Sequence, residues 1–261
     1  MATKPYFPTT RDLPDSAIRR ILDSLLNLIF PELCFLCSAP LARQRDCGVC
    51  TSCWNKAAAL KIKPPRCPSC GLPLHSVEEN SNYLCGRCIL QMPAYAGARS
   101  FGYYTAELSS LIQGMKFSGR RNLAGLLAPL LADTFYDTWG REEFDILAPV
   151  PLHPARRRDR GYNQSELLAC SLARQISLPF KKDALIRTRP TLPQVGLTDT
   201  QRLDNVRGAF KCADPRKVSN KRVLLIDDVM TTGATAASAA QALIEGGALR
   251  VSVLTVARTV R

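Results

Sequence analysis

The sequence lacks a hydrophobic run long enough to cross a membrane. Its longest apolar stretch, AIRRILDSLLNLIF at residues 17–30, contains Arg19, Arg20 and Asp23 and is shorter than the about 20 residues that a spanning helix needs. Its apolar residues recur at helical spacing, so we expect an amphipathic helix that packs on the protein. A signal peptide is not expected either, because the stretch starts late and has no small-residue cleavage site. We therefore expect a cytoplasmic protein without a membrane span.

Acidic residues are scarce relative to basic ones. The chain has 22 Asp and Glu against 35 Lys and Arg, which gives a formal net charge of +13 at pH 7. Basic clusters at residues 116–121, 156–160 and 216–222 could contact the phosphates of single-stranded DNA. A solvated basic surface is the simpler interpretation of each cluster, because charge alone specifies no partner. Single-stranded DNA is therefore a candidate partner without an assigned site.

Two common nucleotide-binding motifs are also absent. The chain has no GxxxxGK[ST], which excludes a nucleoside-triphosphate P-loop, and no GxGxxG, the glycine pattern of dinucleotide-binding folds. A phosphate ligand would have to be bound by a different loop.

Cysteine, by contrast, is abundant and clustered. The 11 cysteines include four C-x2-C pairs, whereas random placement would give about 0.5 such pairs. Thiols of cytoplasmic proteins rarely form disulfide scaffolds, and a C-x2-C pair presents two thiolates to one tetrahedral ion. The spacings C-x2-C-x12-C-x2-C and C-x2-C-x14-C-x2-C are typical of zinc ribbons. The expected ligands of two structural zinc ions are Cys34, Cys37, Cys50, Cys53, Cys67, Cys70, Cys85 and Cys88.

Several alternatives stay open for these cysteines. Cys47 has C-x2-C spacing from Cys50 and could replace a ligand, and the pairs could combine as first with third and second with fourth. Iron–sulfur or redox chemistry is the alternative to structural zinc. His75 lies between the third and fourth pairs, and with four thiolates available we interpret it as a loop residue.

The pattern changes to alternating strands and helices after Pro93 and Gly97. This alternation predicts an α/β fold with a mainly parallel sheet and helices on both faces. Ligands of such sheets bind at the carboxyl ends of the strands. The expected strands lie at 96–104, 144–150, 221–227 and 249–259, and the expected helices at 108–117, 122–139, 161–176 and 234–247.

The stretch VLLIDDVMTTGAT, residues 223–235, carries the strongest functional signal. An apolar strand runs into Asp227 and Asp228 and then into a threonine-rich loop before a helix that begins near Ala234. Amides at a helix N-terminus and threonine hydroxyls form an anion site, and Gly233 permits close backbone approach. Carboxylates beside such a loop require ribose hydroxyls or a magnesium ion as partners. The alternative is a buried strand followed by an acidic, threonine-rich helix cap.

Residues 223–235 resemble, at every position, the 5-phosphoribosyl-1-diphosphate (PRPP) signature of type I phosphoribosyltransferases. The pattern is four apolar residues, two acids, two apolar residues, then Thr, Thr, Gly, any residue and Thr. The resemblance implies that Asp227 and Asp228 are catalytic residues that hold the ribose hydroxyls of PRPP, which binds with magnesium. The implied phosphate-binding residues are Val229, Met230, Thr231, Thr232, Gly233, Ala234 and Thr235.

The whole chain resembles the ComF family (ComFC/GntX-like), in which cysteine-rich ribbons precede a phosphoribosyltransferase-like domain. The stretches that carry the resemblance are FPELCFLC at 30–37, CPSCGLPL at 67–74, LIQGMKFSGRRNLA at 111–124, PVPLHPARRRDRGYNQSELLA at 149–169 and RTRPTLPQVGLTDTQRLDNVRGAF at 187–210. The resemblance covers nearly everything after residue 17. It implies a type I phosphoribosyltransferase-like fold and a role in natural transformation and DNA uptake, alongside other competence proteins.

Three parts of the chain are expected on these grounds. Residues 1–30 form an N-terminal extension with the amphipathic helix, residues 31–93 a double zinc-ribbon module, and residues 94–261 a phosphoribosyltransferase-like domain.

Two further segments are candidate parts of the site. An arginine-rich loop at 156–160 precedes GYNQ and could bind the diphosphate of PRPP, with Arg160, Gly161 and Asn163 as the chosen residues. The polar segment 189–209 resembles the mobile hood that excludes water from phosphoribosyltransferase sites, and a plain surface loop is the alternative. The candidates within that hood are Arg189, Gln194 and Arg202.

Two hypotheses of function follow. The first is a transferase that uses PRPP and an unknown acceptor. The second is a single-stranded DNA-binding or scaffold protein with a catalytically silent phosphoribosyltransferase fold. Two zinc ions on eight thiolates would lower the net charge only to about +9, so the protein is basic under either hypothesis.

Overall fold

The computed structural model describes residues 31–41, 47–74, 83–190, 201 and 205–260. The chain forms two compact units, residues 1–59 and 60–261. The predicted amphipathic helix at 17–30, His75, and the hood candidates Gln194 and Arg202 lie outside the described residues. The unit boundary falls between the second and third C-x2-C pairs, so the second pair of cysteine knuckles belongs to the unit that contains the α/β fold.

The first unit contains the first cysteine cluster and one helix. Leu33 and Pro40 form an antiparallel bridge that closes the first knuckle. Helix α2 (Thr51–Ala58) begins within the second knuckle and contains Cys53, and its N-cap residue Cys50 accepts a hydrogen bond from the backbone N–H of Cys53. The knuckle cysteines therefore also begin the helix.

A four-stranded parallel sheet forms the centre of the second unit, in the order β1-β6-β5-β2. This confirms the predicted parallel sheet. Residues 223–226 of the central strand are fully buried, which explains their continuous apolar run, because both faces of the sheet are covered. The strands are β1 (Gly97–Tyr103), β2 (Ile146–Pro149), β5 (Arg222–Met230) and β6 (Arg250–Arg258).

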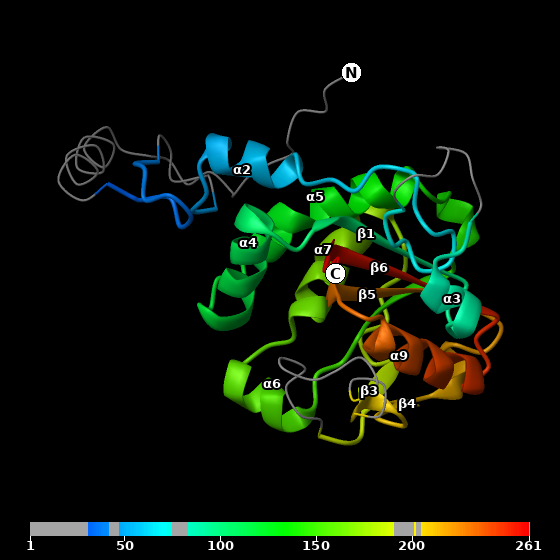
Figure 1. The fold of residues 1–261 in the computed structure, drawn as a ribbon. Helices are drawn as coiled ribbons and strands as arrows, with labels where there is room; N and C mark the ends of the chain where they lie inside the picture. Colours follow the sequence, from blue (N-terminus) through cyan, green and yellow to red (C-terminus); the bar gives the residue numbers. More distant parts are fainter. Residues whose placement is uncertain (1–30, 42–46, 75–82, 191–200, 202–204, 261) are drawn as a thin grey trace. The chain divides into compact units, whose positions relative to one another are not determined.

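Helices pack on both faces of this sheet, as predicted. Figure 1 shows α7 behind the strands and α9 in front of them. Val223 and Leu225 of β5 share one core cluster with Ala239 of α9 and with the second cysteine cluster. No described helix combines the length and the apolar character that a membrane crossing requires. The larger helices are α4 (Ala106–Phe117), α5 (Leu123–Tyr136), α7 (Gln164–Ile176) and α9 (Ala234–Glu245).

The predicted arginine-rich loop is instead a helix, α6 (Pro154–Arg160). Its start is well specified, since His153 Nδ1 accepts a hydrogen bond from the N–H of Ala155 and proline occupies the first helical position. Gly161 ends the helix with φ of 77°, in the left-handed region that favours glycine. The loop prediction was therefore wrong: His153 and Pro154 start a helix here, and Gly161 ends it.

Several short elements were not predicted. Strands β3 (Leu185–Arg187) and β4 (Phe210–Cys212) form a separate antiparallel sheet, and each is too short for periodicity to detect. Strand β5 also continues to Met230, beyond the predicted end at 227. The remaining elements are α3 (Gly86–Leu90) and the 3-10 turns η1 (Arg141–Glu143) and η2 (Pro215–Lys217).

Candidate functional site

A cleft of about 890 Å³ lies at the carboxyl ends of the four parallel strands. Tyr104 follows β1, Val150 follows β2, Thr259 follows β6, and Asp228 lies near the end of β5; all four line the cleft. Parallel strands bring their carboxyl ends to one edge, so residues distant in sequence meet there. The cleft is therefore where the fold predicts a ligand site.

Two adjacent carboxylates lie at the centre of this cleft. Asp227 Oδ1 accepts hydrogen bonds from Ser165 Oγ at 2.8 Å and from the backbone N–H of Asp228 at 2.9 Å. Asp228 is buried, and its Oδ1 lies 2.7 Å from Lys116 Nζ. The acid pair thus has one carboxylate held by hydrogen bonds and one held by an ion pair.

The surroundings raise the pKa of an acid and of a base in the cleft, Asp227 and Lys116. Burial, together with the charge of Asp228, raises the pKa of Asp227 to about 7. Burial opposes a charge on Lys116, but the carboxylate of Asp228 outweighs it and raises the pKa of the ammonium. The pair can therefore hold a proton near neutral pH, and Lys116 stays charged.

Asp227→Asn is expected to stabilise the folded protein at pH 8 by about 2 kcal/mol. This is less than the full pKa shift of Asp227 implies, because its side chain is only partly buried. Because the pKa of Asp227 is raised in the folded state, the folded protein loses stability as the pH rises through 7. The Asn side chain does not ionise, so the variant avoids this loss, and its amide oxygen can still accept the hydrogen bonds from Ser165 and from the N–H of Asp228. Thermal unfolding from pH 5 to pH 8 measures the effect.

Asp145→Asn is the matched control with the opposite sign. Hydrogen bonds from Arg222 lower the pKa of Asp145 to about 2, so its contribution is present at neutral pH and lost as pH falls toward 2. This variant should be destabilised at pH 8. If Asp227→Asn melts at a lower temperature than wild type at pH 8, ionised Asp227 does not destabilise the folded protein, and this prediction is wrong.

The loop between β5 and α9 forms a small hollow next to the acid pair. Asp227, Thr231 and Thr235 line both this hollow and the main cleft. Gly233 has φ of 85°, and a Cβ there would lie 2.9 Å from Met230 Cε, so only glycine suits the turn. The backbone N–H groups at the start of α9 adjoin the hollow, an arrangement that favours an anion.

Basic side chains also line the cleft. Arg156, Arg160 and Arg187 line it together with Lys116. Arg160 Nη1 donates to Gln164 Oε1 at 2.6 Å, and its guanidinium lies 5.1 Å from the centroid of the Phe117 ring. Burial, and then the charge of Arg156, lowers the pKa of Arg187, which is only 8% exposed. Like charges held this closely favour a polyanionic ligand.

Some predicted site residues have structural roles behind the cleft. Asn163 is buried, donates from Nδ2 to the carbonyl of Val150 at 3.0 Å and accepts from the N–H of Ser165 at 3.2 Å, which makes it the N-cap of α7. Thr232 Oγ1 accepts from the N–H of Ala234 at 3.3 Å. Asn163 therefore positions Ser165, and Thr232 bonds to the first residue of α9, whose N-cap is Gly233. Neither Asn163 nor Thr232 lines the described cleft.

The prediction missed three residues that the fold brings to the acid pair. Neither Lys116, at the end of α4, nor Arg187, at the end of β3, was predicted as a residue of the ribose-phosphate site. Ser165 had no signal beyond its position in the first turn of α7. All three require the tertiary structure, although LIQGMKFSGRRNLA does carry Lys116 within one of the family stretches.

The cysteines form two clusters of four. Within each cluster the Sγ atoms lie within 4.8 Å of one another. The Sγ atoms of Cys37 and Cys50 are 3.7 Å apart, and those of Cys70 and Cys85 are 3.6 Å apart. A tetrahedral zinc ion with Zn–S bonds of about 2.3 Å would set its ligands about 3.8 Å apart. The members are Cys34, Cys37, Cys50 and Cys53 in the first cluster, and Cys67, Cys70, Cys85 and Cys88 in the second.

Backbone amides favour the thiolate form of one cysteine in each cluster. Burial opposes thiolate formation, but amide hydrogen bonds outweigh it and lower the pKa of Cys34 to about 6 and that of Cys67 to about 7. Burial raises the pKa of Cys53 and of Cys88, so a metal ion would be needed to hold all four thiolates of a cluster. Consecutive pairs combine, so the alternative pairing is wrong, and Cys47 lies in neither described cluster. Both clusters fit a structural zinc ion.

Comparison with known proteins assigns the chain to a family. The model of a double zinc ribbon domain matches residues 25–95. The chain is 36% identical over 235 residues to the DNA utilization protein YhgH of Escherichia coli K12, covering 89% of this chain and 99% of that protein. It is 31% identical to competence protein F of Haemophilus influenzae, over 81% of this chain and 90% of that protein.

A solved structure shares part of the fold more distantly. It is the glutamine PRPP amidotransferase of B. subtilis in complex with ADP and GMP, with a TM-score of 0.37 and 22% identity over 52% of this chain and 26% of that one. This likeness carries no argument about the site. The sequence relatives do decide the family, since they match nearly from end to end: the chain belongs to the ComF family of YhgH and competence protein F.

Proposed function

We propose that the cleft binds PRPP or a related ribose phosphate with magnesium, and that the protein uses this site in the handling of imported DNA during natural transformation. The observation that carries the proposal is that the acid pair lines one cleft together with an anion-binding loop and several arginines. Asp227 borders both the loop hollow and the cleft, so one ligand can contact the loop, the acids and the arginines together.

The groups that line the hollow and the cleft correspond in kind to the three parts of PRPP. The loop at 231–235 would bind the 5-phosphate through backbone N–H groups and threonine hydroxyls. Asp227 and Asp228 would accept hydrogen bonds from the ribose hydroxyls. The diphosphate would then face Arg160 and Arg187, which also line the cleft.

Magnesium fits the acids chemically, because carboxylate oxygens are the hard ligands that it prefers. When bound, it would neutralise charge on the diphosphate. Lys116 already neutralises Asp228 at 2.7 Å, so the acid pair holds less negative charge than two free carboxylates. That reduces the repulsion between the acids and an anionic ligand.

The proposed reaction is displacement at C1 of the ribose. The bond between C1 and the diphosphate oxygen breaks, its electron pair leaves with the diphosphate, and an acceptor atom forms the new bond to C1. Arg160 and Arg187 would stabilise the charge that develops on the leaving group. No residue of the cleft identifies the acceptor.

The proposal also includes two structural zinc ions and a role with DNA. Each four-cysteine cluster would hold one structural zinc ion, in the reducing environment of the cytoplasm. The printed names of the relatives, a DNA utilization protein and a competence protein, support a role with DNA and with competence proteins.

A second candidate function is single-stranded DNA binding without transfer. Phe117 is 74% exposed at the cleft and stacks with Arg160, a pair that can hold a base next to a backbone phosphate. The two functions differ in what they require of the acids, because backbone phosphates gain nothing from a carboxylate.

The test is calorimetric titration of the zinc-loaded protein with PRPP and magnesium, beside an Asp227→Asn, Asp228→Asn double variant. We expect the variant to bind about 100-fold more weakly, since it loses both charged acceptors. Its binding to single-stranded DNA should be unchanged and salt-sensitive.

A surface variant with the same change in charge is the control. Asp133 and Asp137 both pair with Lys61 outside the cleft, so Asp133→Asn, Asp137→Asn should leave the affinity for PRPP unchanged. Absence of PRPP binding by the wild type, or equal binding by the acid-pair variant, would refute the ribose-phosphate site and favour the DNA-binding alternative.

A further inference from the structure

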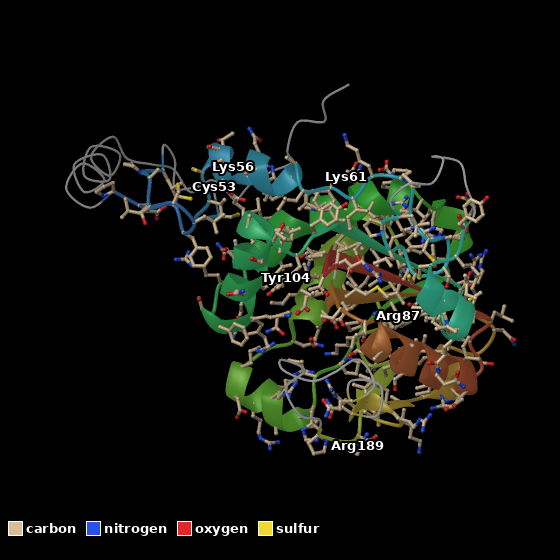
Figure 2. The ribbon with its side chains drawn as sticks, in the orientation of Figure 1. Cys53, Lys56, Lys61, Arg87, Tyr104 and Arg189 are labelled. Carbon is tan, nitrogen blue, oxygen red and sulfur yellow. The ribbon has the colours of Figure 1, made fainter. Side chains whose placement is uncertain are left out.

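The phosphate loop is attached to the second cysteine cluster by the helix of that cluster. Helix α3 begins directly after Cys85 and contains Cys88. Arg87 of this helix donates from Nη1 to the carbonyl of Thr232 at 3.1 Å, and Figure 2 shows Arg87 where α3 approaches α9. One helix therefore carries cluster ligands and a hydrogen bond to the loop.

Arg258 makes a second connection from the end of β6. Its Nη1 donates to the carbonyl of Cys70 at 2.6 Å and lies 3.2 Å from Met230 Sδ, while Nη2 lies 3.7 Å from Cys70 Sγ. Met230 pairs with Arg258 in the sheet register and is the last residue of β5 before the loop. A single guanidinium thus contacts a cluster ligand and the start of the phosphate loop.

The charge of Arg258 points to a metal-loaded cluster as its counter-charge. The side chain is 2% exposed, and among the described residues it has no carboxylate within ion-pair distance. A buried cation is costly unless a negative charge compensates it. Four thiolates around one zinc ion carry a net charge of about −2, and Cys70 is one of them.

The knuckle beside Arg258 is fixed firmly to the sheet. The carbonyl of Ser69 accepts from the N–H of Ala98 at 2.7 Å, and that of Pro68 accepts from Arg99 Nη1 at 2.9 Å. Tyr95 Oη also lies close to the loop, since a Cβ at Gly233 would be 3.1 Å from it. The cluster is therefore hydrogen-bonded to the sheet edge, and Arg87 bonds it to the loop.

We propose that the second four-cysteine site, with its metal bound, is the support that holds the phosphate loop in its binding conformation, through Arg87 and Arg258 as positioning residues. Loss of the metal removes the counter-charge of Arg258 and releases α3, and both connections to the loop weaken. The part of this inference that concerns ligand affinity rests on the proposed ribose-phosphate site, whereas the part that concerns loop rigidity does not.

Amide hydrogen exchange of residues 229–235, in the absence of ligand, tests the rigidity directly. We expect about tenfold faster exchange in Arg87→Ala and in Arg258→Met, because each removes one connection. Arg216→Ala is the control, since Arg216 is exposed and bonds to Asp214 outside this region. Cys53→Ser, in the first cluster, should also leave loop exchange unchanged.

Metal and ligand titrations separate this inference from the proposed function. Removal of zinc by a chelator from Cys53→Ser, in which the second cluster keeps all four cysteines, should accelerate loop exchange. Arg87→Ala should weaken PRPP binding about tenfold at full zinc content. If wild type binds no PRPP, the proposed function fails and loop exchange still decides the inference. Arg87 is exposed, so Arg87→Ala should fold even if Arg258→Met does not. If residues 229–235 exchange at the wild-type rate in Arg87→Ala, the inference is wrong.

Discussion

Cys67→Ser is expected to lower the stability of the unit formed by residues 60–261 by about 5 kcal/mol, or its melting temperature by about 10–20 °C. Cys67 is fully buried, and the four ligands of its cluster belong to the same core as Val223 and Leu225 of the central strand. Loss of one thiolate weakens the metal site and leaves a buried hydroxyl in its place. Thermal unfolding together with measured zinc content checks the effect.

Cys170→Ser is the matched control for that variant. Cys170 lies on α7, is partly exposed and belongs to neither described cluster, so its replacement should change stability by less than about 1 kcal/mol. Equal, small effects of both substitutions would show that the second cluster contributes no metal-dependent stability.

Lys116→Met should destabilise the folded protein by about 3–4 kcal/mol at pH 8. The substitution keeps the apolar stem but leaves the buried Asp228 without its cation, next to Asp227. The same change should also weaken binding of PRPP, because the acid pair then repels an anionic ligand. Chemical denaturation measures the first effect and titration the second.

Lys61→Met provides the comparison for an exposed ion pair. Lys61 pairs with Asp133 at 2.6 Å and also with Asp137, and the side chains of both acids are about half exposed. Such pairs contribute about 0–1 kcal/mol, so this variant should change stability little. A similar small loss in Lys116→Met would contradict the interpretation of the Lys116–Asp228 pair as a buried, compensated charge.

The sheet could be predicted from sequence because buried parallel strands carry continuous apolar runs. Residues 223–226 are an example, since all four side chains are buried. The position of the acid pair near the carboxyl end of β5 followed from the same strand, although the strand continues to Met230. Local pattern was sufficient for these features because both depend on neighbouring residues.

The rest of the cleft depends on contacts between distant residues. Lys116 reaches Asp228 from the end of α4, and Arg187 reaches the cleft from a strand of three residues. No periodicity links these positions, so neither was predicted for the ribose-phosphate site. Asn163 was predicted to bind the ligand, and the structure shows it as the N-cap of α7; its role in binding stays a prediction.

The cysteine spacing predicted the clusters but not their consequences. C-x2-C pairs indicated two tetrahedral sites, and the structure combines consecutive pairs. The contact of Arg258 with Cys70 and Met230 joins one cluster to the phosphate loop, and it depends on the register of β5 with β6. Such a link between a metal site and a ligand loop is visible only in three dimensions.

The measurement that tests the central claim most directly is a crystal structure of the zinc-loaded protein with PRPP and magnesium. We predict the 5-phosphate within hydrogen-bond distance of the backbone N–H groups of residues 231–235, with the ribose hydroxyls on Asp227 and Asp228 and the diphosphate toward Arg160 and Arg187. A ligand bound elsewhere, with the loop and the acid pair unchanged and Lys116 still paired to Asp228, would contradict the account.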